Sequence, residues 1–370
     1  MHICLDARTV SDRFPGIGRY ARNLPSALVA LLGPSEQLTV LRDPIRQRHW
    51  NVTPLAERGA AILDLPLSPF SLRQQWRLPI LLRRQRADLY HSPYYLVPWR
   101  SGIPLVVNIF DLIPLLDGGG MSPGQRRVYA AAVRMAARLA RLVLTASRAA
   151  AADIQRLLHV PDSRLRVIAA AADPVFCPQP AERIRAVRSK LALPERYVLY
   201  VGTNKPHKNL VRLVEAWQRI PLSSVPLVLA GRWDPRYPES RKRTVALGLE
   251  DRVRFLGPIA EADLPALYSG ATLAVVPSLH EGFGLPLIEA MACGAPVACA
   301  RAEALLEVAG DASVLFDPAD IESIATALAT VLGDAGRRTE LAARSLERAT
   351  QFSWSTTARE TLTAYREITT

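Results

Sequence analysis

The segment LAVVPSLHEGFGLPLIEAMACGAPVACA spans residues 273–300 and carries the pattern that decides the fold. A short apolar run, Leu273–Val276, is typical of a buried strand, and a second such run follows at Val297–Ala300. Between them, a glycine-rich turn leads into a helical stretch at Pro286–Met291. Strand, helix and strand in this order predict two parallel strands joined by a crossover helix.

The same alternation runs through most of the 370 residues. The further strand candidates are Ile3–Leu5, Leu38–Leu41, Ala61–Leu63, Leu89–His91, Leu105–Ile109, Leu142–Thr145, Leu165–Ile168, Tyr197–Val201, Leu227–Ala230, Val253–Phe255 and Ser313–Phe316. Further helical candidates include Tyr20–Leu32, Pro123–Ala140, Ala149–Leu158, Asn209–Arg219, Leu264–Tyr268 and Ile321–Leu332.

A polar, proline-rich interruption at Phe176–Pro194 divides this alternation into two series. We therefore predict an α/β protein with two Rossmann-like, doubly wound domains and a linker within the interruption. The expected domains are residues 1–178 and 179–354. Ligands of paired α/β domains bind at the carboxyl ends of strands, in the cleft between the domains.

The positive charge of the chain is concentrated in its N-terminal half. Residues 1–178 hold 23 Arg, no Lys and 12 acidic residues, a balance of +11, whereas the remainder is close to neutral. A basic half suits nucleic acid, an anionic membrane or an anionic substrate. The four scattered cysteines are interpreted as reduced core thiols. The N-terminus lacks the order of a signal peptide and no run is apolar enough to span a membrane, so we expect a cytoplasmic protein.

Two loops that follow strands are rich in anion-binding groups. In the loop after Tyr197–Val201, Gly202 allows close approach, Thr203 and Asn204 offer hydrogen bonds, and Lys205 and Lys208 offer charge. A lysine beside a helix N-terminus is unfavourable unless an anion lies between them, which favours a diphosphate site over a solvated loop.

The second such loop lies within residues 273–300. Free N–H groups at Phe283, Gly284 and Leu285, just before a helix, would point at an anion. Glu281 precedes this turn beside Gly282, and Glu289 lies one helical turn further on. Both carboxylates would accept hydrogen bonds from sugar hydroxyls; the alternative for Glu289 is a surface position on the helix.

Two weaker signals lie in the N-terminal half. Gly16, Ile17 and Gly18 follow the first strand and precede a helix, where glycine amides can approach an anion; the alternative is a tight turn. Asp111 follows the strand Leu105–Ile109 and would face the cleft, or would serve as a helix N-cap or turn residue. We interpret His91 as a structural residue.

Together these loops resemble glycosyltransferase family 4, and the resemblance runs nearly from end to end. It is carried by Gly16–Tyr20, His91–Pro93, Asp111–Pro114, Ser147, Gly202–Asn209, Phe255–Gly257, Glu281–Glu289, Cys293–Val297, Glu307–Ala312 and Asp317–Pro318. Glu281 and Glu289 are the two ends of the family's E-x7-E signature. The form G-T-x-x-P-x-K-N at Gly202–Asn209 is most similar to bacterial mannosyltransferases that build polysaccharides.

The resemblance implies a GT-B fold and retaining, metal-independent transfer from a nucleotide sugar, with no cofactor. It implies that Lys208 contacts the donor diphosphate, with Gly16–Gly18 and Phe283–Leu285 also lining it. Glu281 would hold donor-sugar hydroxyls and Glu289 the nucleotide ribose. The segment Phe352–Trp354 and the helix after it, about residues 355–370, resemble the part that crosses back to the N-terminal domain.

The sequence departs from the family's pattern at three places. Phe110 stands where many members have His, and Thr203 stands where many have Arg, so that Lys205 or Arg232 would supply the second charge. Ala170-Ala171 replaces an Asn-Gly pair.

The expected function is mannosyl transfer from GDP-mannose to a glycan or lipid-diphosphate-linked acceptor in cell-surface polysaccharide synthesis. The acceptor would meet the N-terminal domain, where the Arg-, Trp- and Leu-rich segment 72–86 would rest on an anionic inner membrane face or be a solvated helix surface. Alternatives are glucosyl, N-acetylglucosaminyl or rhamnosyl transfer from a UDP- or dTDP-sugar, an epimerase or phosphorylase of the same fold, a non-catalytic binding protein, and a nucleic-acid-binding protein, which we do not favour.

Overall fold

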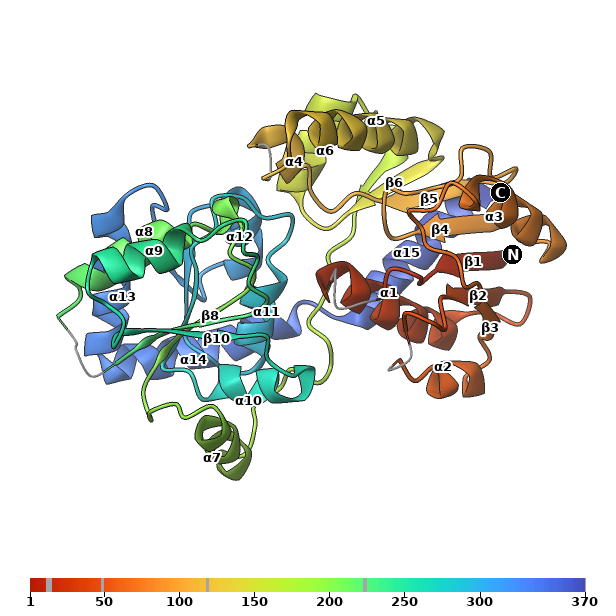
Figure 1. Cartoon of the computed structure of the whole chain (residues 1–370). Coiled ribbons are helices and arrows are strands. Elements are labelled where there is room, and N and C mark those ends of the chain that lie inside the picture. Colours follow the sequence, from red (N-terminus) through yellow and green to blue (C-terminus); the bar gives the residue numbers. More distant parts are fainter. Residues whose placement is uncertain (11–14, 48–49, 118–119, 222–224, 370) are drawn as a thin grey trace. The chain divides into compact units, whose positions relative to one another are not determined.

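The computed structural model describes residues 1–10, 15–47, 50–117, 120–221 and 225–369 (Figure 1). The chain forms two compact units. The first comprises residues 1–115, 121–170 and 353–370, and the second comprises residues 116–120 and 171–352. The division at 170/171 lies eight residues before the boundary at 178/179 expected from the sequence pattern.

The first unit is built on a parallel seven-stranded sheet with the order β3-β2-β1-β4-β5-β6-β7. Its strands are β1 (His2–Asp6), β2 (Gln37–Arg42), β3 (Ala61–Asp64), β4 (Leu89–Ser92), β5 (Leu105–Asn108), β6 (Leu142–Thr145) and β7 (Leu165–Val167). Every residue of β4, β5 and β6 is buried, as expected for parallel strands covered on both faces. The strand order reverses between β1 and β4, and ligands of such sheets bind beside that reversal.

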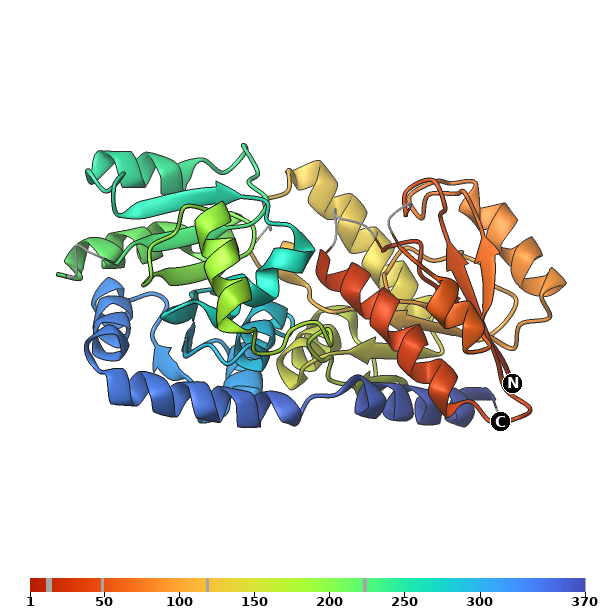
Figure 2. The same cartoon turned by 90° about the horizontal axis from the view of Figure 1, so that it is seen from below.

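The helices of the first unit are α1 (Pro15–Leu28), α2 (Thr53–Glu57), α3 (Gln74–Arg84), α4 (Ile113–Leu116), α5 (Pro123–Leu139), α6 (Arg148–Leu158) and α15 (Trp354–Thr369). The C-terminal helix α15 packs against α1, and Figure 2 shows the blue and red helices side by side. The crossing of the C-terminal helix back to the N-terminal domain is thereby confirmed.

The second unit is built on a parallel six-stranded sheet with the order β10-β9-β8-β11-β12-β13. Its strands are β8 (Val198–Val201), β9 (Leu227–Ala230), β10 (Val253–Gly257), β11 (Leu273–Val276), β12 (Val297–Ala300) and β13 (Val314–Phe316). Its helices are α7 (Ala181–Lys190), α8 (Leu210–Arg219), α9 (Glu239–Ala246), α10 (Leu264–Ser269), α11 (Leu285–Ala292), α12 (Glu303–Ala309), α13 (Ile321–Gly333) and α14 (Ala335–Thr350).

Helix packing in this unit follows the doubly wound pattern. Helix α8 packs against α9 and α13, and α11 packs against α10, α12 and α14. The core side of α8 carries Leu213, Val214 and the fully buried Trp217, a spacing of three to four residues. The strand order reverses between β8 and β11, so the loops after these two strands meet at the ligand-binding edge of the sheet.

Two expectations about helices need correction. The interruption at Phe176–Pro194 contains helix α7, which packs on α10. The pattern missed it because Val187 alone of its residues is buried, so no apolar period stands out. The helix expected at Tyr20–Leu32 begins at Pro15, a residue favoured at the first helical position, so Gly16, Ile17 and Gly18 lie in its first turn rather than in a loop before it.

The buried His91 links the sheet of the first unit to the C-terminal helix. Its Nε2 pairs with Oδ1 of Asn108 at 2.6 Å, and its Nδ1 pairs with the hydroxyl of Tyr365 on α15. The side chain is completely buried. Both ring nitrogens therefore have partners inside the core, and the structural interpretation of His91 is confirmed.

Acid should destabilise the first unit through His91. Burial lowers the pKa of His91 from 6.5 to about 4, so between these values the unfolded chain binds a proton that the folded chain does not. The free energy of unfolding is therefore unaffected by protonation of His91 above pH 6.5. It decreases as the pH falls from 6.5 toward 4, by about 3 kcal/mol in all. Urea unfolding at several pH values in this window should show a weaker pH dependence for His91→Gln; an unchanged dependence would contradict this assignment.

Candidate functional site

The loops after β8 and β11 lie together at the carboxyl edge of the second sheet. The N–H of Leu279 donates to the carbonyl of His207 at 2.8 Å, which joins the two loops directly. Asn209 adds a second link, because its Nδ2 donates to the carbonyls of Pro277 and Pro318 at 3.1 and 2.8 Å. Asn209 also has a φ of 61°, a left-handed conformation that asparagine tolerates better than most residues. These links hold the neighbouring Lys208 in place.

Lys208 and Glu281, which lie 73 residues apart in the chain, form an ion pair at this edge. The Nζ of Lys208 lies 2.6 Å from Oε1 of Glu281, and the side chains are 16% and 10% exposed. The hydroxyl of Ser278 donates to the same carboxylate oxygen at 2.7 Å. The pair thus places a lysine charge and a carboxylate at the carboxyl edge of the sheet, both partly shielded from water.

Helix α11 begins beside this ion pair with its first amides uncapped. Gly284 precedes the helix with a φ of 106°, and no side chain caps the N-terminus. The carbonyl of Gly284 accepts from the N–H groups of Leu287 and Ile288. Among the described residues, the N–H groups of Phe283, Gly284 and Leu285 have no acceptor. Uncapped N–H groups at a helix N-terminus bind anions.

Glycine is required at position 284. A side chain there would place its Cβ 2.7 Å from Cδ2 of Leu305, and the φ of 106° is strained for any other residue. The preceding Gly282 and Phe283 are buried, and Phe283 packs edge-on against Phe352 with ring centroids 5.9 Å apart. The turn is therefore rigidly supported.

Glu289 lies one helical turn inside α11 and is 1% exposed. The alternative of a surface helix position is therefore wrong. A carboxylate so deeply buried is unusual in a structural helix and fits a role in binding.

The first residues of the loop after β8 are shaped by Tyr200 and Asn204. The hydroxyl of Tyr200 donates to the carbonyl of Thr203 at 2.6 Å and occupies the space that a side chain at Gly202 would need. The amide of Asn204 donates to the carbonyls of Asp234 and Tyr237 and accepts from the N–H of Asp234. Asn204, expected to bind a donor, thus connects its loop to the one after β9, while Thr203 and Lys205 are half-buried.

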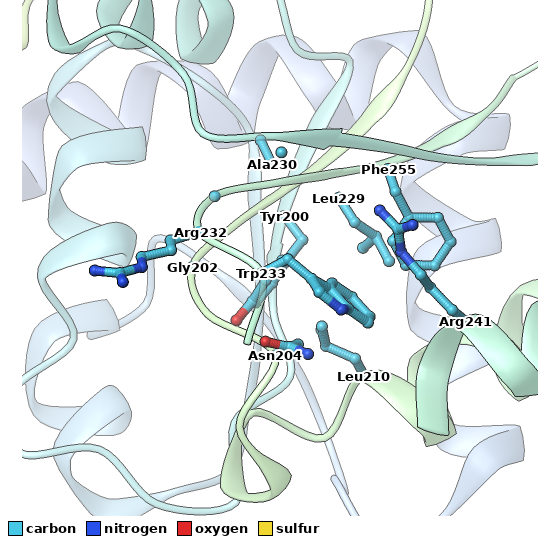
Figure 3. Close-up of a pocket in the computed structure, with 12 residues that line it drawn as sticks. Tyr200, Gly202, Asn204, Leu210, Leu229, Ala230, Arg232, Trp233, Arg241 and Phe255 are labelled. Carbon is cyan, nitrogen blue, oxygen red and sulfur yellow. The ribbon is translucent and has the colours of Figure 1, made fainter. Parts of the chain in front are cut away.

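A small pocket, in part open to solvent, is lined by residues of these two loops, among them Gly202, Asn204 and Trp233. Figure 3 shows Trp233 between Asn204 and Phe255, with Arg241 beside the Phe255 ring. The guanidinium carbon of Arg241 lies 4.6 Å from the Trp233 ring centroid and 4.8 Å from that of Phe255. Trp233 and Arg241 could not be predicted as site residues from the sequence, since neither belongs to a recognisable motif.

The remaining candidates belong to the first unit. Gly16 and Ile17 are half-buried and Gly18 is buried in the first turn of α1. Asp111 follows β5, and its Oδ1 accepts from the N–H of Ile113 at 3.1 Å, so the carboxylate serves the turn that begins α4. Phe110 packs edge-on against Tyr20 with centroids 5.0 Å apart.

Among the residues that the structure describes, no three His, Cys, Asp or Glu side chains are grouped so that they could hold a metal ion. Nor does any helix in those residues combine the length and apolar character needed to cross a bilayer.

Both halves of the chain match known protein families. Residues 15–171 match the family described as "Glycosyl transferase 4-like domain", and residues 183–350 match "Glycosyl transferases group 1".

Three known proteins illustrate the similarity. "O-antigen chain mannosyltransferase B" of Escherichia coli is 30% identical over 99% of this chain and all of its own length. "Serotype-specific mannosyltransferase WbdA" of E. coli is 33% identical over a region that covers 71% of this chain. The same region covers only 33% of the length of WbdA. The crystal structure of Anabaena HepE in complex with UDP-glucose is 23% identical, covers 98% of this chain and 100% of its own, and superposes with a TM-score of 0.75.

Proposed function

Since this chain belongs to the group 1 glycosyl transferases with a glycosyl transferase 4-like domain, and is thus a GT-B glycosyltransferase, we propose that it transfers mannose from GDP-mannose. The acceptor would be a glycan or a lipid-diphosphate-linked saccharide. Its similarity to two E. coli mannosyltransferases, one of them an O-antigen chain enzyme, supports glycosyl transfer in polysaccharide synthesis.

One observation carries the assignment of the site: the Lys208–Glu281 ion pair lies beside the uncapped amides of α11, where the strand order reverses. A diphosphate bound there would meet both a cation and N–H donors. Glu281 would turn its carboxylate to the hydroxyls of the donor sugar, and the buried Glu289 would hold the ribose. Gly202, Thr203 and Lys205 would line the same diphosphate.

The reaction breaks the bond between the anomeric carbon of the sugar and the diphosphate oxygen, and the electron pair leaves with the diphosphate. Lys208 and the amides of Phe283, Gly284 and Leu285 would stabilise this growing negative charge, which is the largest contribution expected in such a site. The acceptor hydroxyl forms the new bond on the same face of the sugar, and its proton passes to the departing phosphate. We propose that this route retains the anomeric configuration and needs no metal.

The first unit would supply the acceptor side. On the family resemblance, Gly16, Ile17 and Gly18 in the first turn of α1 are proposed as further donor-binding residues. The carboxylate of Asp111 would approach the acceptor, with one oxygen already held by the N–H of Ile113.

A thermal-shift panel of sugar nucleotides tests the donor. Ligands that bind the native state raise its melting temperature, so GDP-mannose should give a larger shift than UDP- or dTDP-sugars. A larger shift with UDP-glucose would instead assign the donor to the class bound by HepE. Binding of a sugar nucleotide with no release of nucleotide diphosphate on addition of acceptor glycans would favour a non-catalytic binding protein.

A lipid-linked acceptor would bring the enzyme to the inner membrane face, and α3 offers a surface suited to it. Its exposed residues include Trp76, Arg77, Ile80 and Arg84, and the exposed Arg73 stands at its N-cap. No acidic residue occurs between Asp64 and Asp88. Exposed tryptophan and arginine on one helix face are typical of a helix lying in the headgroup region of anionic bilayers.

A second tryptophan is held near this face. The backbone N–H of Trp99 donates to Oε1 of Gln75 on α3 at 2.7 Å, and Trp99 is 57% exposed. Two exposed indoles therefore belong to the same part of the first unit.

Removing two charges from this face should weaken membrane binding. We expect Arg77→Ser with Arg84→Ser to lower partitioning to phosphatidylglycerol vesicles by roughly 30-fold, at about 1 kcal/mol for each basic residue. Cosedimentation with vesicles measures this, and Arg185→Ser with Lys242→Ser removes the same charge from the second unit as a control. Equal loss in both pairs would show that binding depends on net charge and not on α3.

A further inference from the structure

The cations of the second unit differ in how far their charge is already satisfied. Lys208 shares its charge with Glu281 at 2.6 Å. Asp234 lies in the field of Lys205: hydrogen bonds from Arg236 above all, and the charge of Lys205 to a smaller extent, hold the pKa of Asp234 below its ordinary value. A nucleoside diphosphate brings two or more negative charges, so these two lysines by themselves leave it incompletely balanced.

Arg232 is an exposed cation in the loop after β9, and no described residue forms a hydrogen bond or ion pair with its side chain. Figure 3 shows its guanidinium directed away from Trp233, Arg241 and Phe255, so it does not take part in their stacked arrangement. Its charge is therefore available to a ligand.

The backbone places Arg232 next to the start of the loop after β8. The N–H of Gly202 donates to the carbonyl of Ala230 at 2.9 Å, and that of Gly231 donates to the carbonyl of Gly257 at 2.8 Å. Gly231 has a φ of 130°, and a Cβ at this position would lie 2.1 Å from the carbonyl oxygen of Gly202. The two loops touch through backbone atoms, an approach that only glycine allows.

Both neighbours of Arg232 are fixed. Gly231 is held against Gly202 and Gly257, and the Trp233 ring meets the Phe255 ring edge-on with centroids 5.4 Å apart. The backbone of Arg232 therefore has a defined position, and its long side chain is free to reach an anion. Its planar guanidinium can bind two phosphate oxygens at once.

We propose that Arg232 is the second cation of the donor diphosphate site, reaching from the loop after β9 to the phosphate that Gly202 and Thr203 approach from the loop after β8. This inference rests on the proposed function. Thr203 has a short, neutral side chain, so position 203 supplies no charge to the phosphate, and Arg232 in the loop after β9 would supply it.

Substitution and relocation of the charge test this. Arg232→Ala should weaken GDP binding, measured by calorimetry on the full chain, by about 10- to 100-fold and should raise the KM for the donor. Thr203→Arg in the Arg232→Ala background should recover much of the loss, because it returns a guanidinium to the same phosphate. Lys205→Ala should cost less than Arg232→Ala, since the charge of Lys205 is already partly balanced by that of Asp234.

Controls separate this inference from the proposed function. Arg185→Ala removes another exposed arginine, from α7, and should bind GDP like the wild type. Because Arg232 is exposed, its loss should leave the melting temperature nearly unchanged. Unchanged GDP affinity in Arg232→Ala, or no recovery in the double variant, would overturn the inference. A wild-type chain that binds neither GDP nor UDP would instead overturn the proposed function.

Discussion

Lys208→Ala is expected to lower kcat by about 10²- to 10³-fold, the usual cost of losing one preorganised group aimed at a developing anion. Lys208 is the cation nearest Glu281 at the ligand-binding edge, with Nζ and Oε1 2.6 Å apart, and its position is fixed by the turn that Asn209 closes. Turnover should be followed as release of nucleotide diphosphate with saturating donor. Under that condition weaker binding is overcome and the remaining loss reports the chemical step.

A matched lysine distinguishes this loss from a general effect of charge removal. Lys190 on α7 also forms an ion pair, with Asp263 at 2.6 Å, but Asp263 keeps a second partner in Arg183 at 2.7 Å. Lys190→Ala should therefore retain wild-type turnover. A melting temperature for each variant verifies that both remain folded. Turnover by Lys208→Ala at a rate close to that of the wild type would refute the role proposed for Lys208.

Arg8→Ala is expected to destabilise the first unit by about 3–5 kcal/mol, because it leaves a buried carboxylate without its counter-ion. Asp6 ends β1 and Arg8 stands two residues later, with Nη2 of Arg8 and Oδ2 of Asp6 2.6 Å apart and both side chains buried. Although burial alone raises the pKa of Asp6, the charge and hydrogen bonds of Arg8 hold it below the ordinary value. The hydroxyl of Tyr90 donates to the same carboxylate at 2.6 Å, which is too little to balance a buried charge.

Urea unfolding of the full chain measures this cost. The double variant Asp6→Leu with Arg8→Met should lose less stability than Arg8→Ala, since replacing both members of a buried pair with apolar residues removes the uncompensated charge. The exposed pair Arg42–Asp64 in the same sheet provides the comparison, and Arg42→Ala should cost less than about 1 kcal/mol. Equal costs for Arg8→Ala and Arg42→Ala would contradict the assignment of a buried, structurally required ion pair.

Much of the fold could be predicted because its signals are local. Every strand that the structure describes lies at an apolar run recognised in the sequence, and the helix α11 begins one residue from its predicted start at Pro286. Helix α7 was missed because Val187 is its one buried residue, and a helix without a buried stripe has no period to detect.

The site could be predicted only as separate loops. Lys208 and Glu281 each stood out beside glycines at strand ends, but their ion pair spans 73 residues and exists because β8 and β11 are neighbours in the sheet. Asn204 was expected to bind a ligand, yet its amide is used by Asp234 and Tyr237. Trp233 and Arg241 belong to no motif, and their stacking depends on the position of α9 beside β10.

The sequence by itself therefore determined which segments are strands and helices and which loops carry charge, glycine and carboxylate. These properties follow from periodicity and backbone preference over a few residues. Tertiary structure alone decided which groups meet: His91 with Tyr365 across 274 residues, Lys208 with Glu281, and Gly231 against Gly202. The order of strands in a sheet is set by the packing of the whole unit, and no local pattern in the chain records it.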